Sequence, residues 1–211
     1  MEISNDEYMA TFKSNRDMQK MALQMALETR KFEIDLYWRR AIYFWTFIGA
    51  AFAGIVAIQA SEAEAKDSFT VLVSCLGFVF SCAWVCVNKG SKFWQENWEK
   101  HVDLLEDEIS GPIYKVVFSL DRKSVGIVGM LTGSSAISVS KVNQMLSIYM
   151  SIIWAALVVH FFPSFDCVSE ISRFHAFLVV GSILTAFSFF KLGKASQSGF
   201  SRGAVKRSTI V

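Results

Sequence analysis

The sequence predicts an all-α, polytopic membrane protein with four transmembrane helices, amphipathic cytoplasmic helices and both termini in the cytoplasm. Three observations favour this fold class. The chain of 211 residues is 53% hydrophobic and only 19% charged, whereas soluble domains usually carry about 25% charged residues. It contains four long runs without Asp, Glu, Lys or Arg. Nearly all of its basic residues lie on one side of these runs.

The first segment, residues 1–40, predicts a cytoplasmic amphipathic helix that runs into the first span. It contains no Gly or Pro, and its apolar residues recur with the spacing of one helix face. These residues are Met18, Met21, Met25, Phe32 and Leu36. The segment ends with two aromatic residues and two arginines, Tyr37, Trp38, Arg39 and Arg40. Because such side chains gather at the membrane–water boundary, we expect these four to be membrane-interface anchors.

The four charge-free runs predict transmembrane helices. A helix rises about 1.5 Å per residue, so about 20 residues cross a hydrocarbon core of about 30 Å. None of the runs shows the strict alternation that is typical of a barrel strand. The predicted spans are residues 41–61, 68–88, 142–165 and 174–190, of which the last is at the short end of the range.

The distribution of basic residues predicts the orientation. Of the 21 Lys and Arg residues, seven precede the first span, seven lie in the central segment 89–141 and five lie in the tail 191–211. The two short links between spans hold one each. Because positive residues stay in the cytoplasm, we expect both termini and the central segment inside and the two links outside.

The central segment predicts a second cytoplasmic helix, which continues the second span and ends at Gly111-Pro112. One face of this helix carries Trp94, Trp98, His101 and Leu105. The other faces carry residues that we expect to be solvated, namely Glu96, Glu99, Lys100, Asp103, Glu106 and Asp107. We expect the apolar stripes of the two cytoplasmic helices to pack together, with any surplus facing a neighbouring subunit.

Two interpretations of His101 are open. Glu99 and Asp103 are one helical turn apart and could share a cation near it. Metal sites need ligands that converge on one face, however, and His101 shares its face with aromatic rings. We therefore prefer a packed or interfacial histidine, and we predict no catalytic residue, no cofactor and no metal.

The spans carry a few polar side chains. Asn143, Gln144 and Ser147, near the inner end of the third span, are expected to form hydrogen bonds across helices. His160 and His175 lie near the outer ends of the last two spans. They could form a proton-sensing pair, but ordinary interfacial histidines are the preferred interpretation.

The cysteines predict packing rather than chemistry. Cys75, Cys82 and Cys86 share one face of the second span, where small side chains favour close helix contact over metal or redox sites. Cys167 lies alone in the second outer link. It could pair with its copy in another chain, although we expect a free thiol.

Several function classes are disfavoured. Proton-coupled transporters, pumps and voltage sensors rely on ionisable residues within their spans, and these spans have no Asp, Glu, Lys or Arg. The common nucleotide-binding and zinc-protease motifs are absent. A net charge of +2 is too small for a dedicated nucleic-acid binder. A passive pore would need an axis shared by several subunits.

Three blocks resemble the RipA-type family of small bacterial integral membrane proteins. They are YWRRAIYFWTFIGAAFA (37–53), WVCVNKGSKFWQENWEKHVDLLEDEISGPIYK (84–115) and SVSKVNQMLS (138–147). Their order and spacing agree over roughly residues 30 to 165. The resemblance implies a bacterial inner-membrane protein that assembles as a homo-octamer, and it supplies no catalytic residues. It also implies that Trp94, Trp98, His101 and Leu105 are assembly residues.

Together these observations predict a homo-oligomeric, octameric assembly in the bacterial inner membrane. It would be a scaffold or a passive pore-like ring without catalysis, whose partners are copies of itself and the lipid bilayer. The alternative is a membrane-anchored interaction or signalling module that recruits a soluble partner through its cytoplasmic helices. Ion flux in liposomes would separate the two functions.

Overall fold

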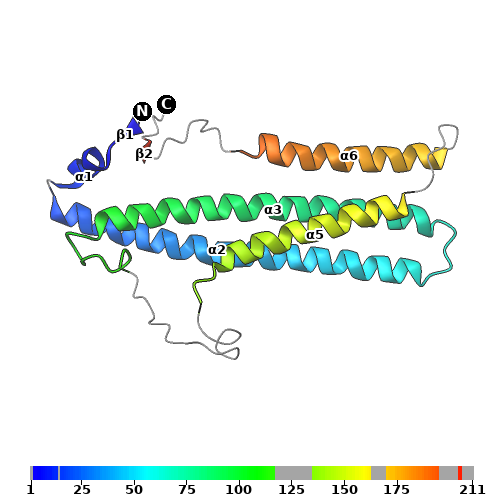
Figure 1. Ribbon diagram of the computed structural model, residues 1–211, viewed down its shortest axis with the longest axis horizontal. Coiled ribbons are helices and arrows are strands. Elements are labelled where there is room, and N and C mark those ends of the chain that lie inside the picture. Colours follow the sequence, from blue (N-terminus) through cyan, green and yellow to red (C-terminus); the bar gives the residue numbers. More distant parts are fainter. Residues whose placement is uncertain (1, 14, 117–134, 163–169, 195–203, 206–211) are drawn as a thin grey trace. The chain divides into compact units, whose positions relative to one another are not determined.

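The computed structural model describes residues 2–13, 15–116, 135–162, 170–194 and 204–205. In chain order its elements are β1 (Glu2–Ile3), α1 (Asn5–Lys13), α2 (Arg16–Gln59), α3 (Lys66–Leu105), α5 (Val139–Phe161), α6 (Glu170–Leu192) and β2 (Ala204–Val205) (Figure 1). The two short strands pair antiparallel, with Glu2 opposite Val205. Most of the predicted tail 191–211 and residues 117–134 of the central segment lie outside the described residues.

Within these described ranges, four helices are long and apolar enough to cross a membrane: α2, α3, α5 and α6. The predicted all-α class with four apolar helices is therefore confirmed. The orientation of the termini stays a prediction.

Two of these helices are much longer than a span. Helix α2 has 44 residues and α3 has 40, whereas about 20 residues cross a bilayer. Each continues without a break from its apolar run into the charged sequence beside it, and the short link between Gln59 and Lys66 makes the two helices antiparallel (Figure 1). Each helix therefore contributes to two compact units. Unit 1 contains α1, α2 up to Ile34 and α3 from Phe93, and unit 2 contains the remainder of α2 and α3 with α5 and α6.

Unit 2 is held together by aromatic packing between its helices. Trp84 of α3 and Trp154 of α5 are 1% and 0% exposed and pack with Ile48 and Ile55 of α2. Gly77 of α3 allows this approach, because a Cβ atom at that position would overlap the Trp154 indole. The glycine therefore sets how closely α3 and α5 pack.

Unit 1 has a separate apolar core. Leu23 and Ala26 of α2 pack with Val102 and Leu105 of α3, and all four are buried. Tyr8 and Phe12 of α1, together with Trp98 of α3, cover this cluster. Helix α1 therefore docks onto the α2–α3 pair through aromatic side chains.

The apolar face of α2 that the sequence singles out is not the face that forms this core. In the single chain, Met18, Met21, Met25 and Phe32 are 40%, 64%, 60% and 57% exposed. Leu23 and Ala26, which lie on another face of the helix, contact α3 instead. The expectation that the two stripes pack together is therefore wrong. These four residues, Met18, Met21, Met25 and Phe32, define the exposed stripe of α2, which no described part of the chain buries.

A second expectation fails where α3 ends. Glu106 was predicted to be solvated, but it is 0% exposed. Its backbone carbonyl accepts hydrogen bonds from the amides of Ile109, Ser110 and Gly111. Its carboxylate accepts hydrogen bonds from the backbone amides of Tyr114 and Lys115, with Oε2 at 2.9 Å from Tyr114 N and Oε1 at 3.2 Å from Lys115 N. Glu106 is buried because the chain folds back over it and supplies donors for its charge.

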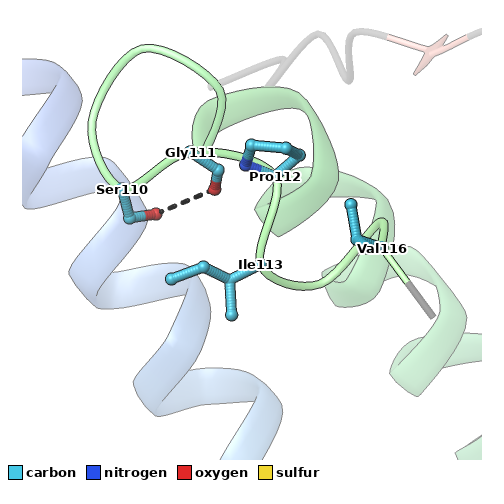
Figure 2. A pocket seen from close by; sticks show the side chains of 5 residues that line it. All are labelled: Ser110, Gly111, Pro112, Ile113 and Val116. Carbon is cyan, nitrogen blue, oxygen red and sulfur yellow. Dashed lines mark hydrogen bonds between the residues drawn. The ribbon is translucent and has the colours of Figure 1, made fainter. Parts of the chain in front are cut away.

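Gly111 makes this fold-back possible. Its φ of 73° lies in the left-handed region, which glycine adopts without a Cβ clash. The turn that follows encloses a shallow cavity of about 280 Å³. Figure 2 shows this cavity, with Ser110, Gly111, Pro112, Ile113 and Val116 around it. The lining is almost wholly apolar, so the cavity offers no convergent polar groups for chemistry.

Candidate functional site

Unit 2 contains a buried polar cluster of four side chains that joins three helices. It comprises Tyr37 of α2, Asn88 of α3, and Asn143 and Ser147 of α5, all at most 7% exposed. Asn143 Nδ2 donates to Tyr37 Oη at 2.6 Å and to Asn88 Oδ1 at 3.2 Å. Asn88 Nδ2 donates to Ser147 Oγ at 3.2 Å. We call these four residues the polar cluster.

The polar cluster lies at one end of the apolar helices rather than at their middle. Asn88 is the last residue of the predicted second span, and Asn143 is near the start of the third. The Asn88 amide both accepts and donates, and the Asn143 amide donates twice, so the members provide one another with partners away from water. The predicted interhelical hydrogen bonds of Asn143 and Ser147 are confirmed. For Gln144 the structure records its backbone carbonyl, which accepts from Ser147 Oγ at 2.7 Å.

The four predicted interface anchors have different surroundings. Tyr37 is 3% exposed and belongs to the polar cluster, whereas Trp38 is 45% exposed. Arg39 is exposed and pairs with Asp35 at 2.8 Å, one turn earlier on α2. Arg40 Nη1 donates to Ser91 Oγ of α3 at 3.0 Å. Two of the four therefore join α2 to neighbouring helices, and two lie on its surface.

The four residues predicted to hold the assembly together also have different surroundings. Leu105 is 1% exposed in the core of unit 1, and Trp98 packs against that core. His101 is half-buried, with Nδ1 at 2.7 Å from the hydroxyl of Tyr8 and its ring 5.2 Å from that of Trp98. Trp94 is also half-buried and meets Phe93 edge-on. Leu105 and Trp98 thus belong to the core of a single chain, and His101 contacts two side chains, Tyr8 and Trp98, that cover it.

His101 has the surroundings of a packed side chain. Burial lowers its pKa below the ordinary value of 6.5, which favours the neutral ring. Glu99 pairs with Arg30 of α2 at 3.3 Å. Burial, followed by the nearby charge of Glu106, raises the pKa of Asp103. Among the described residues no three His, Cys, Asp or Glu side chains converge as metal ligands would.

The remaining cysteines and histidines lie apart from these clusters. Cys75 and Cys82 are buried among the helices of unit 2, and Cys75 packs with Val71 and Val158. His175 is 2% exposed, with Nε2 at 3.0 Å from Ser68 Oγ, while His160 is exposed. The two histidines therefore have different environments. Cys167 lies outside the described residues.

Two site residues escaped the sequence reasoning. Tyr8 contacts His101 from 93 positions away, and no short-range pattern reports such a pair. Asn88 ends an apolar run immediately before Lys89, so it resembles an ordinary boundary residue. Its partner Asn143 lies at the corresponding boundary of the third span. The two asparagines therefore have the same expected depth in the membrane, and this is the signal that could have predicted their contact.

Comparison with known proteins identifies the family of the chain. The model of the octameric membrane protein family, 8xMP, matches residues 20–163. Neither the curated proteins nor the solved structures include a significant match. The matched region contains every member of the polar cluster, the exposed stripe from Met21 onward and the aromatic face of α3. Because the match covers more than half of its residues, this chain belongs to the octameric membrane protein family.

Proposed function

We propose that the protein is one subunit of a homo-octameric ring in the bacterial inner membrane, with both termini in the cytoplasm. The ring acts as a scaffold or passive pore, and no catalytic step is part of the proposal. Membership of an octameric family supports the subunit number. The resemblance of three sequence blocks to RipA-type proteins supports the bacterial inner membrane.

One observation carries this proposal: the exposed stripe of α2. Its four side chains are each at least 40% exposed in the single chain. They precede the first apolar run and are interspersed with charged residues such as Lys20, Glu28 and Lys31. Lipid tails are a poor partner for such a segment, because charged side chains are costly in hydrocarbon. A second copy of the chain provides an apolar partner outside the bilayer.

The polar cluster supports the same proposal in another way. A ring closes only when its subunits have a defined shape, because a heterologous contact with the wrong rotation continues as an open filament. Directional hydrogen bonds among α2, α3 and α5 fix their register. Buried polar groups are best known for this role in helical assemblies. The cluster thus gives each subunit one fixed arrangement of α2, α3 and α5.

The proposal is tested by native mass spectrometry in detergent and in lipid nanodiscs. The wild-type chain should give one species of about eight times its 23.7 kDa mass. A Met21→Glu/Met25→Glu variant should dissociate to smaller species, because it places carboxylates in the subunit contact. The matched control, Gln24→Glu, adds the same side chain to an exposed position beside the stripe and should stay octameric.

Three outcomes are informative. A monomeric or dimeric wild type in both media would overturn the octamer. An octameric Met21→Glu/Met25→Glu variant would remove the exposed stripe from the contact. If the wild type is a monomer that binds a soluble partner, and the Met21→Glu/Met25→Glu variant does not bind it, the alternative of a membrane-anchored interaction module is favoured. For an intact octamer, ion flux in liposomes separates pore from scaffold.

A further inference from the structure

Unit 2 has an open groove between three of its apolar helices. Four residues of α3, four of α5 and Phe190 of α6 line it, and its volume is about 320 Å³. This is at the lower end of the range of about 300–1,000 Å³ typical of small-molecule sites. The groove is separate from the polar cluster, since none of the four cluster residues lines it.

The groove is apolar along its length and positively charged at one end. Phe78, Val85, Ile152 and Ala155 contribute to its walls, and Lys89 is its one charged lining residue. The hydroxyl of Ser151 is already engaged, since it donates to the carbonyl of Ser147 at 2.9 Å. The groove therefore has the chemistry of a hydrocarbon slot with a single cation.

The length of the groove matches one leaflet of a bilayer. Along α3 it extends from Phe78 to Lys89, which at about 1.5 Å per residue is about 16 Å. Half of a hydrocarbon core of about 30 Å is about 15 Å. Helix α5 runs antiparallel beside it, because Asn88 contacts Ser147 while Gly77 contacts Trp154. Lys89 therefore lies near the level where lipid headgroups begin, and Phe78 near the middle of the bilayer.

The ammonium of Lys89 is available for a ligand. The side chain is exposed, and its nitrogen lies 5.9 Å from the centre of the Phe190 ring at the mouth of the groove. Among the described residues, no carboxylate forms an ion pair with it. The cation is thus held over the groove by an aromatic face and lacks an anionic partner within the part of the chain that the structure describes.

We propose that this groove binds one acyl chain of an anionic phospholipid, with the lipid phosphate on Lys89. A phosphate supplies the negative charge that Lys89 lacks, and basic residues at the cytoplasmic membrane surface attract anionic lipids. The acyl chain fills the slot between α3 and α5. The site rests on the proposed orientation, which places Lys89 at the cytoplasmic surface, but it goes beyond the proposed ring and does not depend on subunit number.

The test is native mass spectrometry of detergent-solubilised wild-type protein titrated with phosphatidylglycerol or phosphatidylcholine of identical acyl chains. Lys89→Gln should weaken phosphatidylglycerol binding about fivefold, the loss expected for one surface charge. It should weaken phosphatidylcholine binding less, because the choline cation offsets the charge of that lipid's phosphate. Lys66→Gln, at the other end of the apolar run of α3, removes the same charge and should change the binding of neither lipid. Ala155→Phe should fill the groove and weaken the binding of both lipids.

The result is decisive in either direction. Equal phosphatidylglycerol affinity for Lys89→Gln and Lys66→Gln would overturn the phosphate contact. An Ala155→Phe variant that keeps its lipid affinity but loses subunits would show that a neighbouring chain fills the groove, which would overturn the lipid site. Lys89→Arg should retain phosphatidylglycerol binding, and its failure to do so would count against a charge contact.

Discussion

Asn143 of α5 donates its side-chain amide to the hydroxyl of Tyr37 on α2 across 2.6 Å, although the two residues are 106 positions apart. Both are buried, at 7% and 3% exposed. The same amide reaches Asn88 of α3, so one side chain connects three helices. A shift of any of these helices by one residue would separate donors from acceptors, which makes the polar cluster a lock on helix register.

Replacing Asn143 should test this lock directly. Asn143→Leu keeps the branched shape and the number of heavy atoms but leaves Tyr37 and Asn88 with unpaired buried groups, which should cost about 1–3 kcal/mol. That exceeds the average of about 0.6 kcal/mol for a hydrogen bond between membrane helices. The measurement is thermal unfolding in detergent. Thr185→Ala, which removes an exposed hydroxyl bonded to its own helix, should leave the melting temperature unchanged. An unchanged Asn143→Leu variant would contradict the lock.

The contact of Gly77 with Trp154 predicts that one methyl group is harmful at this position and harmless elsewhere. Gly77→Ala should destabilise the protein by about 1–3 kcal/mol, because the added Cβ overlaps the indole and forces the helices apart. Gly49→Ala and Gly90→Ala have no heavy atom within 4 Å of the added Cβ. These two controls should be neutral or stabilising by up to about 1 kcal/mol, as expected for alanine in a helix. Equal melting temperatures for all three variants would refute the prediction.

Charge-free runs and the placement of polar residues were enough to predict the membrane helices and part of the polar cluster. The runs report burial or lipid contact directly, because a charged residue in hydrocarbon is costly. Asn143 and Ser147 were recognised because amide and hydroxyl groups in a span need partners. The partners themselves, Tyr37 and Asn88, depend on how three helices align, which a local pattern does not contain.

The packing of α2 in unit 1 was predicted wrongly for a related reason. Periodicity identifies an apolar face but does not say which partner covers it. Helix α2 offers two such faces, and α3 contacts the one with Leu23 and Ala26, where the small side chain of Ala26 permits a close approach. The larger Met and Phe side chains stay exposed. Glu106 was misjudged because its partners are backbone amides eight and nine residues later.

Leu105 and Trp98 should differ in their contribution to unit 1, although they share one face of α3. Leu105 is fully buried, so Leu105→Ala should cost about 2–5 kcal/mol. Trp98 covers the core from its edge and remains partly exposed, so Trp98→Ala should cost less. Denaturant unfolding followed by helical circular dichroism measures both, with the exposed Lys100→Ala as the control. A larger loss of unfolding free energy in Trp98→Ala than in Leu105→Ala would contradict this, because it would mean that the Trp98 indole lies at the centre of the core.

The pKa of His101 predicts a pH dependence of stability. Burial lowers the pKa of the folded state below 6.5, so the unfolded chain binds more protons once the pH falls below that value. Stability is then complete above pH 6.5 and decreases as the pH falls towards the folded pKa. Melting temperatures between pH 8 and pH 5 should show a decrease that is smaller in His101→Gln. The exposed His160→Gln should retain the full decrease, and identical pH profiles for wild type and His101→Gln would reject this role.

The buried carboxylate of Glu106 should hold the turn after α3 in place. It accepts the amides of Tyr114 and Lys115, so Glu106→Ala leaves both donors without their acceptor and should cost about 1–3 kcal/mol. Hydrogen exchange of these two amides is the most direct measurement, and both should exchange faster in Glu106→Ala. Glu106→Gln keeps one acceptor oxygen, so its exchange rates should lie between those of the wild type and of Glu106→Ala.

Asp107→Asn is the control, because Asp107 forms an exposed ion pair with Lys115 that should contribute at most about 1 kcal/mol. Equal amide protection in Glu106→Ala and Asp107→Asn would mean that the turn is held by its backbone hydrogen bonds and by Gly111, with no contribution from the carboxylate.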